Sequence, residues 1–230
     1  RSCENYLMSL FSVQKMDQIS QIVSEIEPLA PKDLMIRRMK FFASFERARN
    51  SINYEADMAK VADNMGYLTS GEYADSIFLF RDYQYAAEYK KEMNDIPAAI
   101  EFYKKAVSRD EKKTGALAEL AKLYRRNKQY NEAIATFTEY MTKQGDDKIK
   151  VADYLQLAQM YIPAARQEGL TPEQKQDYLN KGDEALAKAL EKDPTAYQAW
   201  LLRAQMSITD PRTAEEKPRE YYEKALEVMT

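Results

Sequence analysis

Paired carboxylates are the residues of this sequence whose type and spacing come nearest to catalytic chemistry. Adjacent acidic residues stand at Asp146-Asp147 and at Glu215-Glu216. Two carboxylates act as general acid and base when they are buried at a fixed separation, and neighbours in polar loops rarely meet that condition. The first pair and Asp153 also lack the spacing of a calcium-binding loop. We therefore expect a protein without enzyme activity.

The composition excludes most other catalytic and metal sites. The 230 residues contain no His, six Gly and a single Cys, Cys3. His-dependent triads, Cys-rich zinc sites, disulfide frameworks and glycine-rich phosphate loops are therefore excluded, and we predict neither a cofactor nor a metal. The net charge of −3 gives no reason to expect a nucleic-acid partner. No apolar run approaches the roughly 20 residues that span a bilayer, so membrane insertion is not expected either.

The elements that must position any functional residue are helices. Ala, Glu, Lys, Leu, Gln and Met dominate the composition, and apolar residues recur at three- and four-residue spacing along most of the chain. Turn residues interrupt this pattern at regular intervals and leave segments of about 12 to 20 residues, a normal helix length. No segment alternates like a strand. We predict an all-α fold of about six helix pairs.

An internal repeat organises these helices. Tyr83 and Ala87 recur 34 residues later as Leu117 and Ala121, and the motif of residues 99–106 recurs at 133–140 with the same offset. Related motifs follow around residues 154–161, 182–189, 200–204 and 218–225. Such a period is the signature of stacked supersecondary units, each of which buries its apolar face against its neighbours.

The repeat resembles the tetratricopeptide repeat, which contains two antiparallel helices every 34 residues. The resemblance covers residues 81–230 as four repeats and implies one continuous right-handed α-α superhelix. Residues 1–80 fit more loosely and are expected to form divergent helix pairs of the same type, of which residues 1–66 could cover the groove. Extra residues around 163–178 are expected to lengthen a loop or a helix end. The C-terminal repeats resemble those of bacterial proteins, many of them exported, so we favour an exported over a cytoplasmic location while leaving both open.

The resemblance also assigns packing roles. Small residues are expected at the tight crossing within each pair: Ala87, Ala121, Ala158 and Ala204. Large residues are expected to fill the space between one pair and the next: Tyr103, Phe137, Leu186 and Tyr222. Trp200 is expected in the core for the same reason. The sequence departs from the family at Tyr140, where a small residue is usual.

In this family the first helix of each pair lines a concave face that binds peptides. The positions that the resemblance assigns to this face are Arg81, Gln84, Glu88, Lys91, Lys122, Arg125, Arg126, Gln159, Gln198 and Gln205, with Ala118, Leu155, Ile162 and Leu201 as apolar members. The family's carboxylate clamp of Lys, Asn, Lys and Arg is not reproduced, because its positions are matched here by Gln84, Glu88, Ala118 and Lys122. Lys122, Arg125 and Arg126 form a basic cluster that either receives an acidic segment or is a solvated helix face.

The sequence therefore predicts a scaffold that binds a protein or peptide of unknown identity on a concave helical face. Two other interpretations remain open. A Tyr-rich surface also suits a module that binds glycans or small molecules. The absence of an initiating Met and the weak repeats before residue 80 favour a structural piece of a larger assembly.

Overall fold

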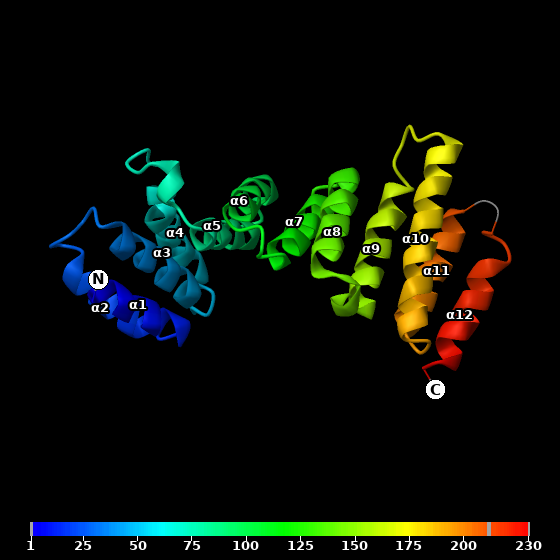
Figure 1. Ribbon diagram of the computed structural model, residues 1–230, viewed down its shortest axis with the longest axis horizontal. Coiled ribbons are helices and arrows are strands. Elements are labelled where there is room, and N and C mark those ends of the chain that lie inside the picture. The colour runs from blue at the N-terminus through cyan, green and yellow to red at the C-terminus, as the bar shows by residue number, and fades with distance from the viewer. Residues whose placement is uncertain (1, 211–212, 230) are drawn as a thin grey trace. The chain divides into compact units, whose positions relative to one another are not determined.

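The computed structural model describes residues 2–210 and 213–229 (Figure 1). These residues form twelve α-helices and three short 3-10 helices, and they contain no strand. The chain divides into two compact units, Arg1–Arg109 and Asp110–Thr230. The predicted all-α fold is thereby confirmed.

The first unit contains α1 (Ser2–Ser12), α2 (Met16–Ile26), α3 (Leu34–Ala48), α4 (Tyr54–Met65), η1 (Gly66–Leu68), η2 (Asp75–Ile77), α5 (Phe80–Glu92) and α6 (Ile96–Arg109). The second unit contains α7 (Gly115–Arg126), α8 (Tyr130–Gln144), η3 (Asp146–Lys148), α9 (Val151–Ala164), α10 (Pro172–Lys192), α11 (Tyr197–Thr209) and α12 (Lys217–Glu227). Consecutive helices pack together as the six predicted pairs, in the manner of an α-α solenoid. The odd-numbered helix is the first of each pair.

The boundary that the sequence predicts near residue 80 and the division that the structure shows after Arg109 mark two different features of the chain. Residue 80 begins α5, where the repeat signature becomes regular, whereas the division after Arg109 marks where the chain separates into compact units. The single continuous solenoid expected over residues 81–230 stays a prediction.

Three helix pairs are closed by the same tight turn. Gln14, Asn94 and Lys128 each adopt a positive φ, of 58°, 59° and 61° respectively. In each turn the following amide donates to the carbonyl five residues earlier: Lys15 to Leu10, Asp95 to Lys90 and Gln129 to Tyr124, all at 2.9 Å. A left-handed residue after a helix satisfies its last carbonyls in this way. The α1–α2 pair therefore turns like the regular repeats, although its sequence signature is weak.

The small residues expected at the helix crossings are buried, as their predicted role requires. The four crossing alanines are fully buried, and so are three of the four large residues between pairs: Tyr103, Phe137 and Leu186. Tyr222 is the exception, with 43% of its surface exposed. It lies on α12, the last helix that the structure describes. Trp200 was also wrongly expected in the core: it is only partly buried and stacks on Tyr221 with ring centroids 6.0 Å apart.

The extra residues before α10 lengthen both the loop and the helix, as expected. The α10 helix is 21 residues long and begins with Pro172 in its first turn. Thr171 caps it, because its hydroxyl oxygen accepts from the Gln174 amide at 3.2 Å while the Gln174 side chain accepts from the Thr171 amide at 2.9 Å. Such a reciprocal pair satisfies two amides that the helix itself leaves open.

Two first helices share a buried aspartate in their third position. Asp82 on α5 accepts from the Leu79 amide at 2.7 Å and from the Tyr67 hydroxyl at 2.9 Å. Asp153 on α9 accepts from the Lys150 amide at 2.8 Å and from the Tyr140 hydroxyl at 3.2 Å. The large residue at position 140 is therefore explained by its bond to the aspartate that begins the next helix.

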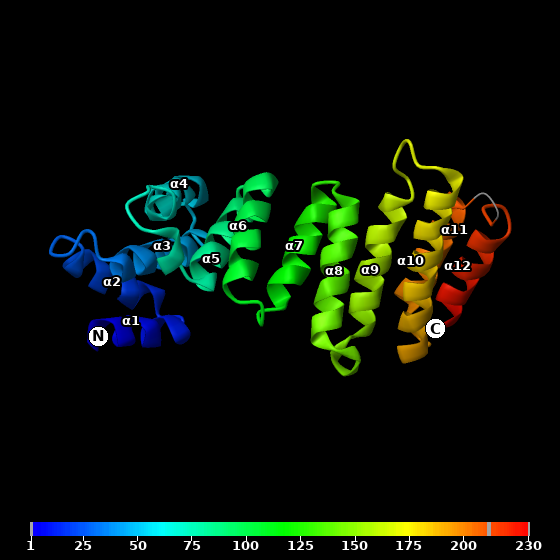
Figure 2. The same ribbon diagram turned by 45° about the horizontal axis from the view of Figure 1, so that its top comes forward.

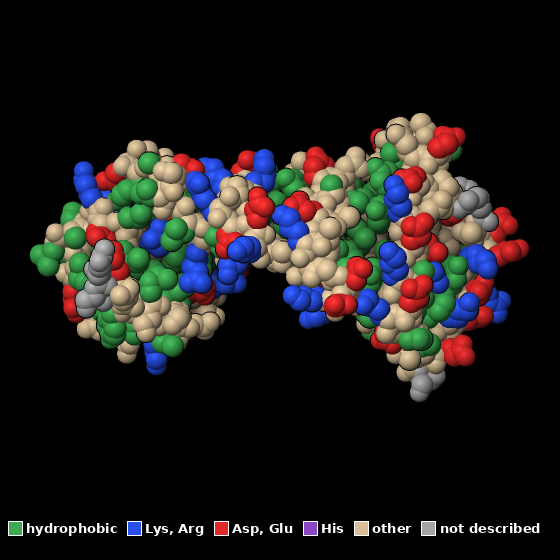
Figure 3. All heavy atoms as spheres, in the orientation of Figure 1, with side chains coloured by type: hydrophobic (Ala, Val, Ile, Leu, Met, Phe, Trp, Pro, Cys, Tyr) green, Lys and Arg blue, Asp and Glu red, His purple; other side chains and the backbone are tan. Residues whose placement is uncertain are grey.

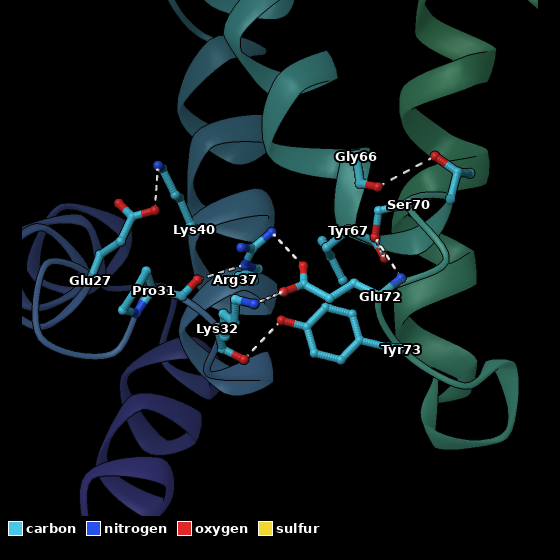
Figure 4. A network of polar contacts seen from close by, with 11 residues as sticks. Glu27, Pro31, Lys32, Arg37, Lys40, Gly66, Tyr67, Ser70, Glu72 and Tyr73 are labelled. Atoms are coloured by element: carbon cyan, nitrogen blue, oxygen red, sulfur yellow. Dashed lines mark hydrogen bonds and ion pairs between the residues drawn. The ribbon is translucent and has the colours of Figure 1, made fainter.

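The segment between η1 and η2 is held against the start of α3 (Figure 4). The Tyr73 hydroxyl donates to the Lys32 carbonyl at 2.8 Å. Glu72 lies 3.7 Å from the Lys32 ammonium and 3.3 Å from the Arg37 guanidinium. Arg37 also donates to the Pro31 carbonyl at 2.8 Å. These contacts fix a long connection within the first unit.

Candidate polypeptide-binding face

The predicted site residues of the first unit lie on α5. Arg81 is exposed, with its guanidinium 5.0 Å from the centre of the Phe11 ring on α1. Glu88 accepts from the Tyr103 hydroxyl and lies 2.6 Å from the Lys91 ammonium. Glu88 and Lys91 therefore contribute to contacts within the α5–α6 helix pair. Gln84, on the same helix as both, is partly buried.

Aromatic side chains fill the space between the first helices of this unit. The Phe11 ring lies 5.5 Å from Phe42 and 5.7 Å from Tyr85, and Phe42 stacks on Tyr85 at 4.2 Å. The Tyr85 hydroxyl donates to Glu46 at 2.9 Å. Burial, reinforced by this carboxylate, raises the pKa of Tyr85 above its ordinary value. The N-terminal helix thus packs against α3 and α5, and their own side chains occupy the area next to Arg81.

In the second unit, the predicted basic cluster lies along one side of α7. Lys122, Arg125 and Arg126 stand three and four residues apart, which places their side chains on neighbouring positions of the helix surface. Lys122 lies 2.7 Å from Glu119. Lys122 and Arg125 are partly buried, and Arg126 is exposed. Ala118 lies about one turn before Lys122, closer to the start of α7.

The neighbouring first helices α9 and α11 continue this surface with neutral residues. Gln198 and Gln205 are exposed on α11, and Gln159 and Leu155 are partly buried on α9. The two helices pack on each other. Arg166 also joins them, donating to the Thr209 hydroxyl at 2.9 Å and to the Gln205 carbonyl at 3.4 Å.

The structure corrects the predicted apolar members of this face at two positions. Ile162 was wrongly assigned to the face: it is buried in the core formed by α9, α10 and α11. Ile208, which the sequence reasoning missed, is 54% exposed and lies two turns beyond Leu201, itself 37% exposed. The seven-residue spacing from Leu201 was the signal that would have found it.

We use the term A-face for the exposed surface of α7, α9 and α11 in the second unit. Its members are Ala118, Lys122, Arg125, Arg126, Leu155, Gln159, Gln198, Leu201, Gln205 and Ile208. The surface changes from basic on α7 to neutral and apolar on α11.

The acidic pairs lie in exposed positions. Asp146 and Asp147 form part of η3, and Glu215 and Glu216 precede α12. Among residues 2–210 and 213–229, no group of three or more His, Cys, Asp or Glu side chains is arranged to hold a metal ion. Within the same part of the chain, no helix combines the length and apolar character needed to cross a membrane.

Comparisons with known proteins agree with this architecture. Residues 91–157 match the family model for the tetratricopeptide repeat. The C-terminal part of a repeat-containing protein from Cytophaga hutchinsonii is similar over 98% of this chain and 78% of its own, with 20% identity and a TM-score of 0.66. A kinesin-light-chain-like repeat protein from Podospora anserina covers 83% of this chain and 95% of its own, with 12% identity and a TM-score of 0.60.

The protein MamA from Desulfovibrio magneticus is similar over 94% of this chain and 95% of its own, with 16% identity and a TM-score of 0.52. No curated protein matches the sequence. Residues 91–157 therefore carry the tetratricopeptide repeat, and the chain has the fold of tetratricopeptide-repeat proteins. A specifically bacterial type of repeat stays a prediction.

Proposed function

We propose that this protein is a non-catalytic interaction scaffold that binds a polypeptide on the A-face of its second unit. Tetratricopeptide-repeat proteins generally mediate protein–protein interactions, and proteins built from stacked helix pairs present extended binding surfaces. The observation that carries the proposal is the contrast between the units. In the first unit, aromatic side chains fill the space between α1, α3 and α5, whereas Leu201 and Ile208 on α11 are exposed.

The chemistry of the A-face favours a partner with acidic and apolar residues. Arg125 and Arg126 offer guanidinium groups that pair well with carboxylates. Leu201 and Ile208 offer apolar surface whose burial stabilises a complex. The partner segment would therefore place acidic residues over α7 and apolar residues over α11, with the Gln side chains between them contacting its backbone.

Site-specific photo-crosslinking in the intact 230-residue chain tests this proposal. A photoreactive phenylalanine replaces Gln159 or Gln205 on the A-face, and Glu132 on α8 as the matched control, because it is exposed on a second helix of a pair. We expect a partner from native extract to be crosslinked from the two A-face positions and not from the control. Crosslinks from position 132 alone would contradict the proposal.

The second candidate function is a structural role in a larger assembly, and the exposed apolar side chains of α12 support it. Tyr222 and Leu226 are 43% and 63% exposed, although Phe137 and Leu186, which occupy the repeat position of Tyr222, are fully buried beneath the next pair. An exposed apolar stripe on a helix surface favours association. Light scattering on the purified chain separates the two: a stable monomer supports the scaffold, and a concentration-dependent oligomer that Leu226→Glu dissociates supports the assembly.

A further inference from the structure

A groove lies on the opposite side of the second unit from the A-face, between α8 and α10. Both ribbon views place α9 between these helices (Figure 1, Figure 2). The groove has a volume of about 320 Å³. Hydrophobic side chains gather in this strip of the surface (Figure 3). Its lining is made by Thr138, Met141, Thr142, Asp146, Ile149, Tyr154, Leu157, Tyr161, Lys181, Glu184, Ala185 and Lys188.

The floor of the groove is apolar and aromatic. Tyr154, Leu157 and Tyr161 come from α9, and the buried Met141 and Ile149 come from the α8 side. Tyr154 and Tyr161 lie seven residues apart, which is two helical turns or about 10 Å along α9. An apolar side chain bound between the two rings would bury apolar surface of both partners. This burial is the main source of affinity in such grooves.

The edges of the groove offer hydrogen-bond donors at both ends. Lys181 and Lys188 also lie two turns apart, on α10, which runs antiparallel to α9 and so places one Lys near each Tyr. Lys181 is paired with Asp177 at 2.6 Å. Burial raises the pKa of Tyr161, and the nearby Lys181 opposes that rise. Within the described part of the chain, Lys188 and the Tyr154 hydroxyl have no hydrogen-bonding partner.

We propose that this groove is a second docking site, for a polypeptide segment with an apolar side chain beside a carboxylate. The apolar side chain would contact Leu157 and the two tyrosine rings. The carboxylate would accept from the Lys188 ammonium and the Tyr154 hydroxyl, which are the donors available at one end. Asp146 and Glu184 also line the groove and would accept from backbone amides of the segment. This site is separate from the A-face and does not depend on the function proposed for it.

Nuclear magnetic resonance of the full-length protein with a defined peptide tests the proposal. The probe is the acetylated and amidated peptide Gly-Glu-Leu-Phe-Glu-Gly. We expect its titration to shift signals from Leu157, Ala185 and Lys188. Lys188→Glu should weaken binding roughly ten-fold, the loss expected for one charge-assisted hydrogen bond. Tyr154→Phe removes only a hydroxyl and should weaken binding several-fold.

Lys192→Glu is the matched control, because Lys192 lies on α10 outside the groove and carries the same charge change. We expect it to bind the peptide like the parent protein. Equal affinity of Lys188→Glu and Lys192→Glu would overturn the proposal, as would the absence of any shift at millimolar peptide. Shifts confined to Leu201 and Ile208 would also overturn it, while supporting the A-face instead.

Discussion

The buried aspartate of α5 gives a sharp prediction about stability. Asp82 is fully buried and its carboxylate accepts from Arg38 at 2.6 and 2.7 Å, in addition to the amide and hydroxyl bonds described above. Asp153 makes the corresponding amide and hydroxyl bonds, but within the described residues it has no arginine partner. Asp82→Ala and Asp153→Ala therefore remove the same local bonds and differ in one buried ion pair.

The magnitudes follow from what each substitution leaves behind. Loss of a helix cap and one hydroxyl bond costs about 1–2 kcal/mol of unfolding free energy, which we expect for Asp153→Ala. Asp82→Ala additionally leaves Arg38, 7% exposed, as a buried charge without its partner. Breaking a buried pair in this way costs about 3–5 kcal/mol. With about 3–5 kcal/mol as the whole cost of Asp82→Ala, this variant should be less stable than Asp153→Ala by about 2–3 kcal/mol.

Native-state hydrogen exchange read by mass spectrometry is the assay, because it resolves the two units within the full chain. Each 1.4 kcal/mol of lost stability lowers amide protection about ten-fold. Protection of α3 and α5 should fall about a hundred-fold further in Asp82→Ala than protection of α9 falls in Asp153→Ala. The double variant Arg38→Met with Asp82→Ala should recover part of the loss, because it removes the buried charge. Equal losses in the two single variants, or no recovery in the double variant, would refute the reasoning.

Three further predictions concern the second unit. Gly182→Leu should destabilise it by about 1–3 kcal/mol in urea, because a Cβ at position 182 would lie 3.1 Å from the Tyr161 Cβ and 2.8 Å from the Met206 Cε. Gly115→Leu, with open space around it, should cost less. Tyr140→Phe should lower the unfolding free energy by about 1 kcal/mol through its lost bond to aspartate, checked in the same urea series. Two lysines lower the pKa of Glu220 to about 2, so its contribution to α12 is present above its ordinary pKa of 4.5 and is lost as pH falls towards 2; a carbon-13 titration of its carboxyl checks this.

Much of the fold is predictable because helix crossings leave a strong pattern. Where two helices cross closely, only a small residue fits, so Ala87 and Ala121 recur at the repeat distance and are buried as expected. The same pattern makes Tyr140 visible as a departure, although its reason, a bond to Asp153, depends on the next helix pair.

The aromatic packing between α1, α3 and α5 in the first unit could not be predicted from the spacing of apolar residues along the chain. Phe11, Phe42 and Tyr85 come from three different helix pairs, and only their relative orientation brings the rings together. The exposure of Tyr222 likewise depends on which helix follows it in space. Local periodicity reports which side of a helix is apolar, but not which neighbour covers that side.

The central claim is that the A-face holds the partner, and a charge reversal at its basic end tests it most directly. The partner is captured from native extract with the parent protein and with the triple variant Lys122→Glu, Arg125→Glu and Arg126→Glu, while circular dichroism confirms that the helices of the variant are intact. We predict that the triple variant loses the partner. Retention of the partner as firmly as by the parent protein would contradict the claim.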